Sequence, residues 1–478
     1  MNWTWRDLRI RERLSSRSRY ASEDEGAVHR SLLYDFAVYL AQRYECRQLI
    51  QVSPEERLVS RPDKLPILGV KPRWTVTSRI HGPDLARQSV VICADLHLHA
   101  ERITGALETT RRLVEHAPVA VLTTAQPRAE RGESERRARE RGIAEFRNLL
   151  ERSGLRTLFL GVTFSRGMRK ASTMAIVTRA QPAPIVPASF QAIAMVACFN
   201  EEDIIAPFLE HTIRQGLEVH LLDNWSTDRT AEKASQFLQR GVRTIEKFPQ
   251  DGPNACLDLY EILRRKEELA CQTPGDWFIH LDADELRESP WPELTIREAL
   301  YRADVAGFNA VDHSSIVFPP TGSEFHEDSP VAPQFQWFEF GGHSTYALQI
   351  KAWKRQPERV DCALRGGHEA RFPGRRVYPY KFLLRHYPVR SQAHGEKKIF
   401  GERLPRYSAG GRQRGWHIQY DDLAREHSFI RDPSTLLFFD PETFYEEYLT
   451  ERLSSVGLSI EDPETVLPVS REGTVADL

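Results

Sequence analysis

Apolar runs alternate with amphipathic stretches in the first part of the chain, and this alternation predicts strands followed by helices. Strands are predicted at residues 46–52, 90–96, 119–124, 155–162 and 171–177, and helices at residues 29–44, 103–115 and 134–153. Strands that alternate with helices are typical of a mostly parallel α/β sheet. Residues 1–180 are therefore predicted to form one Rossmann-like α/β domain.

Three prolines in QPAPIVP, at residues 181–187, interrupt this alternation. Proline excludes a helix interior and favours an extended segment, so a linker is predicted at residues 181–188. The alternation then restarts, with strands predicted at 193–199, 217–223, 242–248 and 277–281, and helices at 203–215, 230–240 and 254–271. A second α/β domain is expected at 189–430, followed by a charged helix at 441–454 and an acidic tail within 431–478.

Composition narrows the class of protein only slightly. The 478 residues contain 65 basic and 67 acidic side chains, a formal charge of −2, so nothing indicates a nucleic-acid or anionic-membrane partner. The sequence has no window of 18 uncharged apolar residues and no signal-peptide pattern, so neither a membrane span nor export is expected. The six cysteines show no CxxC pairing, which favours reduced thiols and a cytoplasmic location.

The stretch FIHLDADE, residues 278–285, places three carboxylates directly after an apolar strand. Asp282 and Asp284 are two residues apart, so in an extended backbone both carboxylates point to the same side. Carboxylates this close repel one another unless water or a cation separates them, and oxygen ligands suit Mg²⁺ or Mn²⁺. An exposed acidic turn is the alternative reading.

Two further polar clusters follow predicted strands. DNWSTDRT begins with Asp223 and Asn224 and includes Asp228, and CFNEED contains Asn200 and Glu201. A carboxylate at a strand end is well placed to accept hydrogen bonds from a nucleobase or a ribose. Helix capping and turn formation explain the same residue types equally well.

Taken together, VACFNEEDIIAPFLEHTIRQGLEVHLLDNWSTDRT and DWFIHLDADE resemble family 2 glycosyltransferases of the GT-A fold, over roughly residues 190–400. The resemblance implies a nucleotide-diphosphate sugar donor, a Mn²⁺ or Mg²⁺ ion and inversion at the anomeric carbon. It implies that Asp223 contacts the nucleotide and that Asp282 and Asp284 meet the ribose and the metal. Further donor-binding candidates in these motifs are Asn200, Glu201, Asn224 and Asp228.

An inverting transfer also needs a base that takes the acceptor proton. The candidates are Asp312 in FNAVDHSS and Glu369 in LRGGHEARFPG, although each also suits a loop acid bonded to the backbone. FLLRHYPVRSQAHGEKK resembles the closing region of the family. This resemblance implies that His386 completes the metal shell and that Arg390 and Lys397 hold phosphate.

The first domain shows a fainter resemblance to class I S-adenosylmethionine-dependent methyltransferases. In such enzymes the loop after the first strand is rich in glycine, whereas here it reads VSPEERLVS, with Pro54 and two glutamates. Proline and acidic side chains oppose the close approach of a cofactor carboxylate. We therefore predict a degenerate methyltransferase-like domain that no longer binds the cofactor.

Two other functions are compatible with parts of the sequence. An apolar strand ending in DADEL superficially resembles the start of haloacid-dehalogenase-type phosphohydrolases, but those enzymes carry the aspartate pair on their opening strand. A nucleotide-sugar-binding scaffold without catalysis is the non-enzymatic alternative. The sugar, the nucleotide base and the acceptor are not encoded in any motif; resemblance alone suggests a glycan or glycolipid precursor as acceptor.

Overall fold

The computed structural model divides the chain into two compact units. Unit 1 contains residues 1–182 and 442–450, and unit 2 contains residues 183–441 and 451–478. The structure describes residues 48–52, 73–77, 89–96, 103–441 and 444–448, together with Ala37, Leu40 and Cys46. Within 103–441 it does not describe residues 126–128, 131–132, 164–171, 180–181, 254–257, 323, 328, 342–347, 407–422 and 424–426.

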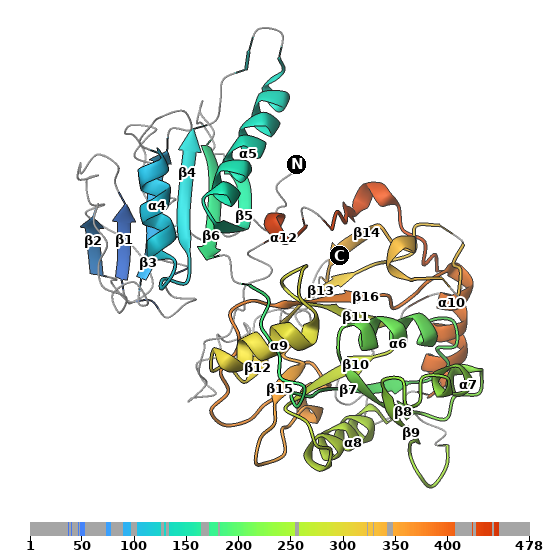
Figure 1. Ribbon diagram of the computed structural model, residues 1–478. Coiled ribbons are helices and arrows are strands. Elements are labelled where there is room, and N and C mark those ends of the chain that lie inside the picture. The colour runs from blue at the N-terminus through green and yellow to red at the C-terminus, as the bar shows by residue number, and fades with distance from the viewer. Residues whose placement is uncertain are drawn as a thin grey trace, which may run out of the picture. The chain divides into compact units, whose positions relative to one another are not determined.

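Unit 1 is built on a six-stranded sheet in the order β2-β1-β3-β4-β6-β5 (Figure 1). Its strands are β1 (Gln48–Val52), β2 (Arg73–Thr77), β3 (Ser89–Leu96), β4 (Ala120–Ala125), β5 (Leu155–Thr163) and β6 (Ser172–Arg179). The first four run parallel, whereas β6 is antiparallel to both β4 and β5. This arrangement confirms the predicted Rossmann-like sheet with its terminal strand pair.

The helices α4 (Ile103–Leu113) and α5 (Glu135–Arg152) pack on this sheet, and Ser134 caps α5. The core between them is apolar and includes Ile50, Val91, Leu122 and Phe146. Strand β2 was missed by the sequence prediction. The predicted helix at residues 29–44 is described only at Ala37 and Leu40. In the VSPEERLVS loop only Val52, the end of β1, is described, and residues 53–60 lie outside the described part of the chain.

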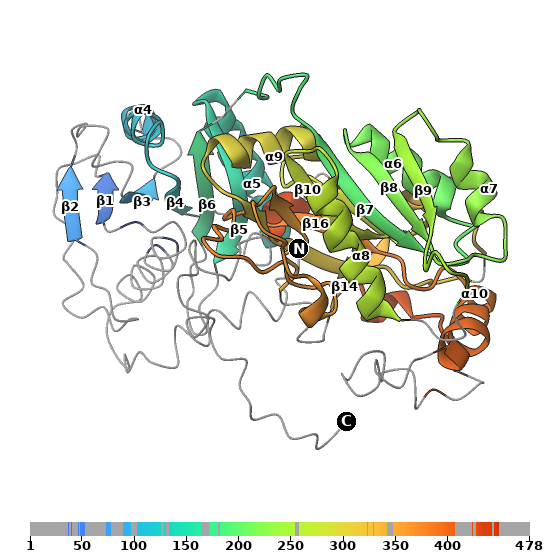
Figure 2. The same cartoon turned by 90° about the horizontal axis from the view of Figure 1, so that it is seen from below.

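Unit 2 contains a second six-stranded sheet in the order β12-β15-β10-β7-β8-β9. Its strands are β7 (Ala192–Cys198), β8 (Glu218–Asp223), β9 (Val242–Lys247), β10 (Trp277–Asp282), β12 (Ala310–Val311) and β15 (Ala352–Lys354). Strands β10, β7, β8 and β9 are parallel neighbours, as the sequence predicted, while β15 is antiparallel to β10. Figure 2 shows these strands running side by side.

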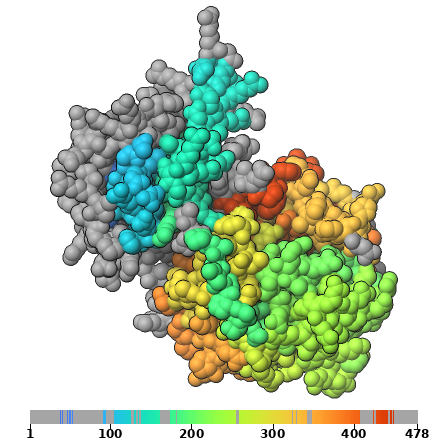
Figure 3. All heavy atoms as spheres, viewed as in Figure 1, coloured from blue at the N-terminus to red at the C-terminus, as the bar shows by residue number. Residues whose placement is uncertain are grey.

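Helices cover both faces of this sheet (Figure 1). They are α6 (Ile205–Arg214), α7 (Thr230–Ser235), α8 (Leu259–Gln272) and α9 (Ile296–Val305). Alternate residues of β7, Ile193 and Met195, face a core that Leu269 and Ala270 of α8 complete, because successive strand side chains point to opposite faces. In the space-filling view, the green residues of α6, α7 and α8 lie together on the surface of unit 2 that is turned towards the viewer (Figure 3).

A smaller sheet adjoins the second one in the order β11-β16-β13-β14-β17. Its strands are β11 (Glu285–Glu288), β13 (His313–Val317), β14 (Trp337–Phe340), β16 (Phe382–His386) and β17 (Leu437–Phe438). Beyond β16 the chain forms α10 (Gln392–Glu396) and the π-helical segment η4 (Lys397–Arg403). The only described piece of the predicted helix at 441–454 is α12 (Phe444–Glu447), which packs on β5 of unit 1.

None of the described helices has the length and apolar character required to cross a membrane. No disulfide joins the five cysteines in the described part of the chain, which are Cys46, Cys93, Cys198, Cys271 and Cys362.

Candidate functional site

The polar clusters predicted from the sequence meet at one edge of the second sheet. Because β7, β8 and β10 are parallel neighbours, their carboxyl ends lie side by side. In register, Asp282 at the end of β10 pairs with Ala197, and Asp223 at the end of β8 pairs with Cys198. The loops that begin at Phe199, Asn224 and Ala283 therefore leave the sheet at the same edge.

Asp223 is completely buried and one of its carboxylate oxygens has no hydrogen-bond partner. Its Oδ1 accepts from the backbone N–H of Ser226 at 3.0 Å. Its Oδ2 is buried without a hydrogen-bond partner. A buried acceptor left unpaired costs about 1–3 kcal/mol, so this oxygen is a place where a ligand donor is stabilising.

The other predicted donor-binding residues of these loops are bonded within the protein. Asn200 has a positive φ of 52°, and its Oδ1 accepts from the Thr227 backbone N–H at 2.8 Å. The Asn224 amide donates to the Phe248 carbonyl at 2.8 Å. Asp228 accepts from the Thr230 backbone N–H at 2.9 Å, as a turn or cap residue does. These three side chains hold the loops in shape around Asp223.

A cationic side chain lies over the Phe199 ring beside these loops. The Arg406 guanidinium carbon is 3.6 Å from the Phe199 ring centroid, and Arg406 Nη2 donates to Asn224 Oδ1 at 2.7 Å. Arg406 therefore brings a positive charge next to Asp223 from a distant part of the chain.

In the DADE cluster, Asp282 is the open member. Its side chain is 47% exposed, and its Oδ1 lies 3.6 Å from the Nζ of buried Lys266. Burial alone would raise the pKa of Asp282, but Lys266, His280 and Lys351 outweigh that effect and hold the pKa below its usual range. Asp282 is therefore ionised and accessible to a ligand at neutral pH.

Asp284 and Glu285 are buried, and protein cations neutralise them. Lys398 Nζ donates to Asp284 Oδ2 at 2.9 Å. Arg287 and Lys351 donate to Glu285 at 2.6 and 2.8 Å. Burial raises the pKa of Asp284, but Lys398 and His386 outweigh that effect and hold the pKa well below its usual range. The cations around these two acids are thus side chains of the chain itself.

His386 lies beside the acidic cluster. The antiparallel pairing of β11 with β16 sets His386 opposite Glu285, and His386 Nε2 is 3.7 Å from Asp284 Oδ1. In the described part of the chain, the side chains whose potential metal-ligand atoms lie close together are a different set from Asp282, Asp284 and His386.

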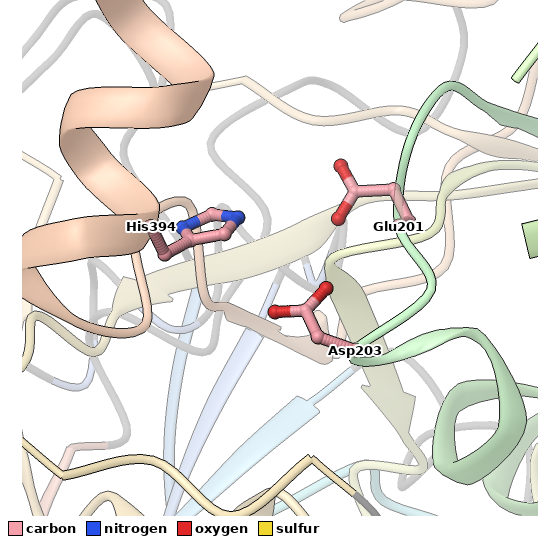
Figure 4. Close-up of side chains that lie close together, drawn as sticks. All are labelled: Glu201, Asp203 and His394. Atoms are coloured by element: carbon pink, nitrogen blue, oxygen red, sulfur yellow. The ribbon is translucent and has the colours of Figure 1, made fainter. Parts of the chain in front are cut away.

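That group is Glu201, Asp203 and His394, whose ligand atoms all lie within 4.8 Å of one another. Figure 4 shows the three side chains pointing towards a common point. The guanidinium of Arg390 is bonded to all of them: to Glu201 and Asp203 at 2.6 Å, and to His394 at 2.7 Å. A cation already occupies the centre of this group, and it is an arginine.

Arg390 and Lys397, which were both predicted to hold phosphate, lie in different surroundings. Arg390 is fully buried and its donors are engaged by acids and a histidine, which is the arrangement of a structural clamp. Lys397 is 55% exposed and has one long ion pair, 3.8 Å to Glu402. Lys397 keeps the freedom that phosphate binding needs.

The two predicted bases differ in accessibility. Asp312 is fully buried, its Oδ1 accepts from the backbone N–H groups of His313 and Gln349 at 2.8 Å, and its Oδ2 lies 3.2 Å from Lys381 Nζ. These are the contacts of the structural alternative. Glu369 retains slight exposure, and Arg375 donates to its Oε1 at 2.8 Å.

Sequence reasoning missed the buried cations of the site. Lys266 interrupts the apolar stripe of α8, and such an interruption is a readable signal. It donates to His280 Nδ1 at 2.9 Å and to the Leu281 carbonyl at 2.8 Å. Lys398 gives no such signal, because nothing in the sequence distinguishes it from Lys397.

His368 was also missed. Burial and the charge of Lys351 lower the pKa of His368 to about 4, against the opposing effects of Glu285 and Asp282. The ring is therefore neutral at pH 7. Its pKa depends on the charges of Lys351, Glu285 and Asp282, which also belong to the acidic cluster and its partners.

Residues 194–253 match the family model described as glycosyl transferase family 2. This segment of the chain is similar to the family 2 glycosyl transferases. The matched segment runs from β7 to the loop after β9 and includes Asp223. It lies within unit 2.

No curated protein is similar enough in sequence to count as a relative of this chain. Solved structures that resemble parts of it include TarS from S. aureus, at 12% identity and a TM-score of 0.25, over 42% of this chain and 36% of that one. TarS 1–349 in complex with UDP has the same identity and TM-score, over 44% of this chain and 63% of that one. The chain thus spans less than two thirds of the length of either TarS structure.

A third structure that resembles part of the chain is magnesium protoporphyrin IX methyltransferase from Synechocystis PCC 6803 with bound SAH. It is 12% identical, with a TM-score of 0.22 over 37% of this chain and 95% of that one.

Proposed function

We propose that unit 2 transfers a sugar from a nucleotide-diphosphate donor to an acceptor hydroxyl group, with inversion at the anomeric carbon. The observation that carries this proposal is the buried, unpaired Oδ2 of Asp223 inside the matched family segment. A nucleobase N–H or a ribose O–H satisfies such an acceptor. Asn200, Asn224 and Asp228 hold the loops around it, and Glu201 joins them to the DADE cluster through Lys398.

The open edge beside Asp223 suits the rest of the donor. Asp282 is the exposed acid of the cluster and accepts hydrogen bonds from a ribose or sugar hydroxyl group. Lys397 is the exposed cation closest in sequence to the buried charges and attracts the diphosphate. The leaving group carries negative charge, so positive charge at this edge stabilises the transition state.

Glu369 is our proposed base. Its Oε1 is fixed by Arg375, while the cation nearest to Oε2 in the described contacts is Arg365 at 3.9 Å. A carboxylate that one hydrogen bond orients and whose second oxygen has only a long ion pair suits proton transfer. As the bond from the anomeric carbon to the phosphate oxygen breaks, the acceptor oxygen bonds to that carbon and its proton passes to Glu369. The nucleoside diphosphate leaves with the electron pair of the broken bond.

The family resemblance predicts Mn²⁺ or Mg²⁺ at Asp282 and Asp284, with His386 as a third ligand. Asp282 suits such an ion, because its carboxylate is exposed at the strand end. Asp284 does not, because the ammonium of Lys398 already occupies its Oδ2. We therefore assign no step of the transfer to a metal. The acceptor, a glycan or a glycolipid precursor, and the cytoplasmic location stay predictions.

Ligand-induced stabilisation tests the proposal. UDP, GDP and TDP, each with EDTA and with Mn²⁺, are added to the purified protein, and the thermal midpoint is measured. A ligand that binds only the native state raises the midpoint, and one nucleotide is expected to do so. The corresponding sugar nucleotides are then assayed for release of the nucleoside diphosphate.

The outcomes separate the rival functions. If no nucleotide raises the midpoint under any condition, the glycosyl donor site is wrong. Binding without release of the nucleoside diphosphate favours the non-catalytic scaffold. Rapid hydrolysis of p-nitrophenyl phosphate favours the phosphohydrolase.

A further inference from the structure

Lys398 bridges two acids that come from distant parts of the chain. Its Nζ donates to Glu201 Oε1 and to Asp284 Oδ2, both at 2.9 Å. The side chain is 6% exposed, and the two carboxylates are 8% and 5% exposed. A buried charge is tolerated when it is paired and hydrogen-bonded, and all three groups satisfy each other here.

The other oxygens of these two acids are also engaged. Glu201 Oε2 accepts from Arg390 at 2.6 Å, and Asp284 Oδ1 faces His386 Nε2 at 3.7 Å. A divalent ion on Asp284 has to displace the Lys398 ammonium or lie beside it. A divalent ion and the Lys398 ammonium on the same carboxylate would repel each other strongly, because the effective dielectric constant of a buried site is low. The donor set around Asp284 therefore fits an ammonium group and not a metal ion.

The backbone around Lys398 is unusual. Lys398 lies in the π-helical segment η4 (Lys397–Arg403). Such turns are rare in proteins, but where they occur they are often at functional sites. The neighbouring Lys397 is mostly exposed, while Lys398 is buried. This segment directs one of two consecutive lysines into the acidic cluster at the carboxyl ends of the strands.

We propose that the Lys398 ammonium is the resident cation of the donor site and takes the place of a divalent metal ion. This inference rests on the proposed function. An ammonium group has three N–H donors, and Glu201 and Asp284 use two of them. The third is left for an oxygen of the donor diphosphate. Lys398 thus stabilises the departing phosphate, and the transfer proceeds without a divalent ion.

Two measurements on the wild-type protein decide the proposal without relying on a variant. Donor turnover after exhaustive treatment with EDTA is expected to equal turnover with added Mn²⁺. The electron paramagnetic resonance signal of free Mn²⁺ is expected to be undiminished by the protein in the absence of nucleotide. Turnover that disappears in EDTA and returns with Mn²⁺ overturns the proposal, and so does stoichiometric Mn²⁺ binding by the wild type.

The variant Lys398→Met extends the test. It leaves Glu201 and Asp284 without their shared cation, so metal-free turnover should fall at least about 100-fold, and the variant should gain Mn²⁺ binding that the wild type lacks. Lys354→Met is the matched control, because Lys354 forms a half-exposed ion pair with Asp304. If Lys398→Met does not fold, Lys398→Arg keeps a charge in place and should retain turnover in EDTA.

The failure of this inference differs from the failure of the proposed function. Donor binding that requires Mn²⁺ overturns the role of Lys398 alone. Absence of donor binding with and without metal overturns the proposed function, and the role of Lys398 with it.

Discussion

Arg390 donates to Glu201 Oε2 at 2.6 Å, and this contact ties the loop after β7 to the segment after β16. The same guanidinium forms a two-point pair with Asp203, which lies just before the first residue of α6. Paired bonds between arginine and a carboxylate are both strong and directional. Arg390 thereby fixes the relative position of Glu201 and of the segment that carries Lys398, so the geometry of the acidic cluster depends on it.

Arg390→Met is expected to lower the free energy of unfolding by about 3–5 kcal/mol, because buried Glu201 loses one of its two cationic partners and partly buried Asp203 loses its two-point partner. Urea unfolding followed by tryptophan fluorescence measures the change. Arg431→Met is the control: Arg431 forms an exposed pair with Glu339, which is worth about 1 kcal/mol or less. Equal losses in the two variants would contradict the clamp role.

Asp223→Asn is expected to weaken nucleotide binding while leaving the fold intact. The asparagine oxygen can still accept from Ser226, but an amide N–H group replaces the unpaired Oδ2 acceptor. A ligand donor would then face a donor. Calorimetric titration with the nucleotide that stabilises the wild type should show at least about a tenfold weaker Kd, which corresponds to about 1.4 kcal/mol. Unchanged affinity would move the nucleotide away from Asp223.

Gly367 is required where the RGGH turn packs on β10. Its φ is +82°, and a Cβ there would lie 2.6 Å from His280 Nε2. Gly367→Ala should destabilise the protein by about 1–3 kcal/mol through overpacking, in addition to the strain of a positive φ. Gly374→Ala isolates the strain, because Gly374 has a φ of +67° and open space around it. The difference between the two variants measures the clash.

The buried ammonium of Lys266 makes the free energy of unfolding depend on pH. Burial lowers the pKa of Lys266 to about 8, against the opposing effect of Asp282. The unfolded chain keeps the ordinary value near 10.5, so between pH 8 and 10.5 it binds more protons than the folded protein, and stability rises with pH. The slope is at most about 1.4 kcal/mol per pH unit. Comparing wild type with Lys266→Gln should show this contribution in the wild type only, and parallel profiles would refute it.

Much of the site was predictable from strand ends. Asp223 and Asp282 lie together because each terminates an apolar run, and parallel neighbours bring their carboxyl ends to one edge. For Asp228 the sequence left two alternatives, donor binding and helix capping or turn formation. Its contacts are those of a turn residue. Local sequence therefore fixed where the acids lie.

The partners of those acids were not predictable, because they come from far along the chain. Lys398 and Asp284 are 114 residues apart, and Lys351 and Glu285 are 66 apart. No local pattern reports such pairing. The expectation of a cation among the acids was sound in physical terms, but the cations contacting Asp284 and Glu285 are lysine and arginine side chains.

The choice of base is tested by comparing Glu369→Gln with Asp312→Asn. Glu369→Gln removes the proposed proton acceptor, so kcat should fall about 10²–10⁴-fold with little change in nucleotide affinity. Asp312→Asn weakens the partner of Lys381 in a closed interior, so it should lower stability, and the remaining folded enzyme should keep the kcat of the wild type. A kcat that falls in Asp312→Asn but not in Glu369→Gln would transfer the role of base to Asp312.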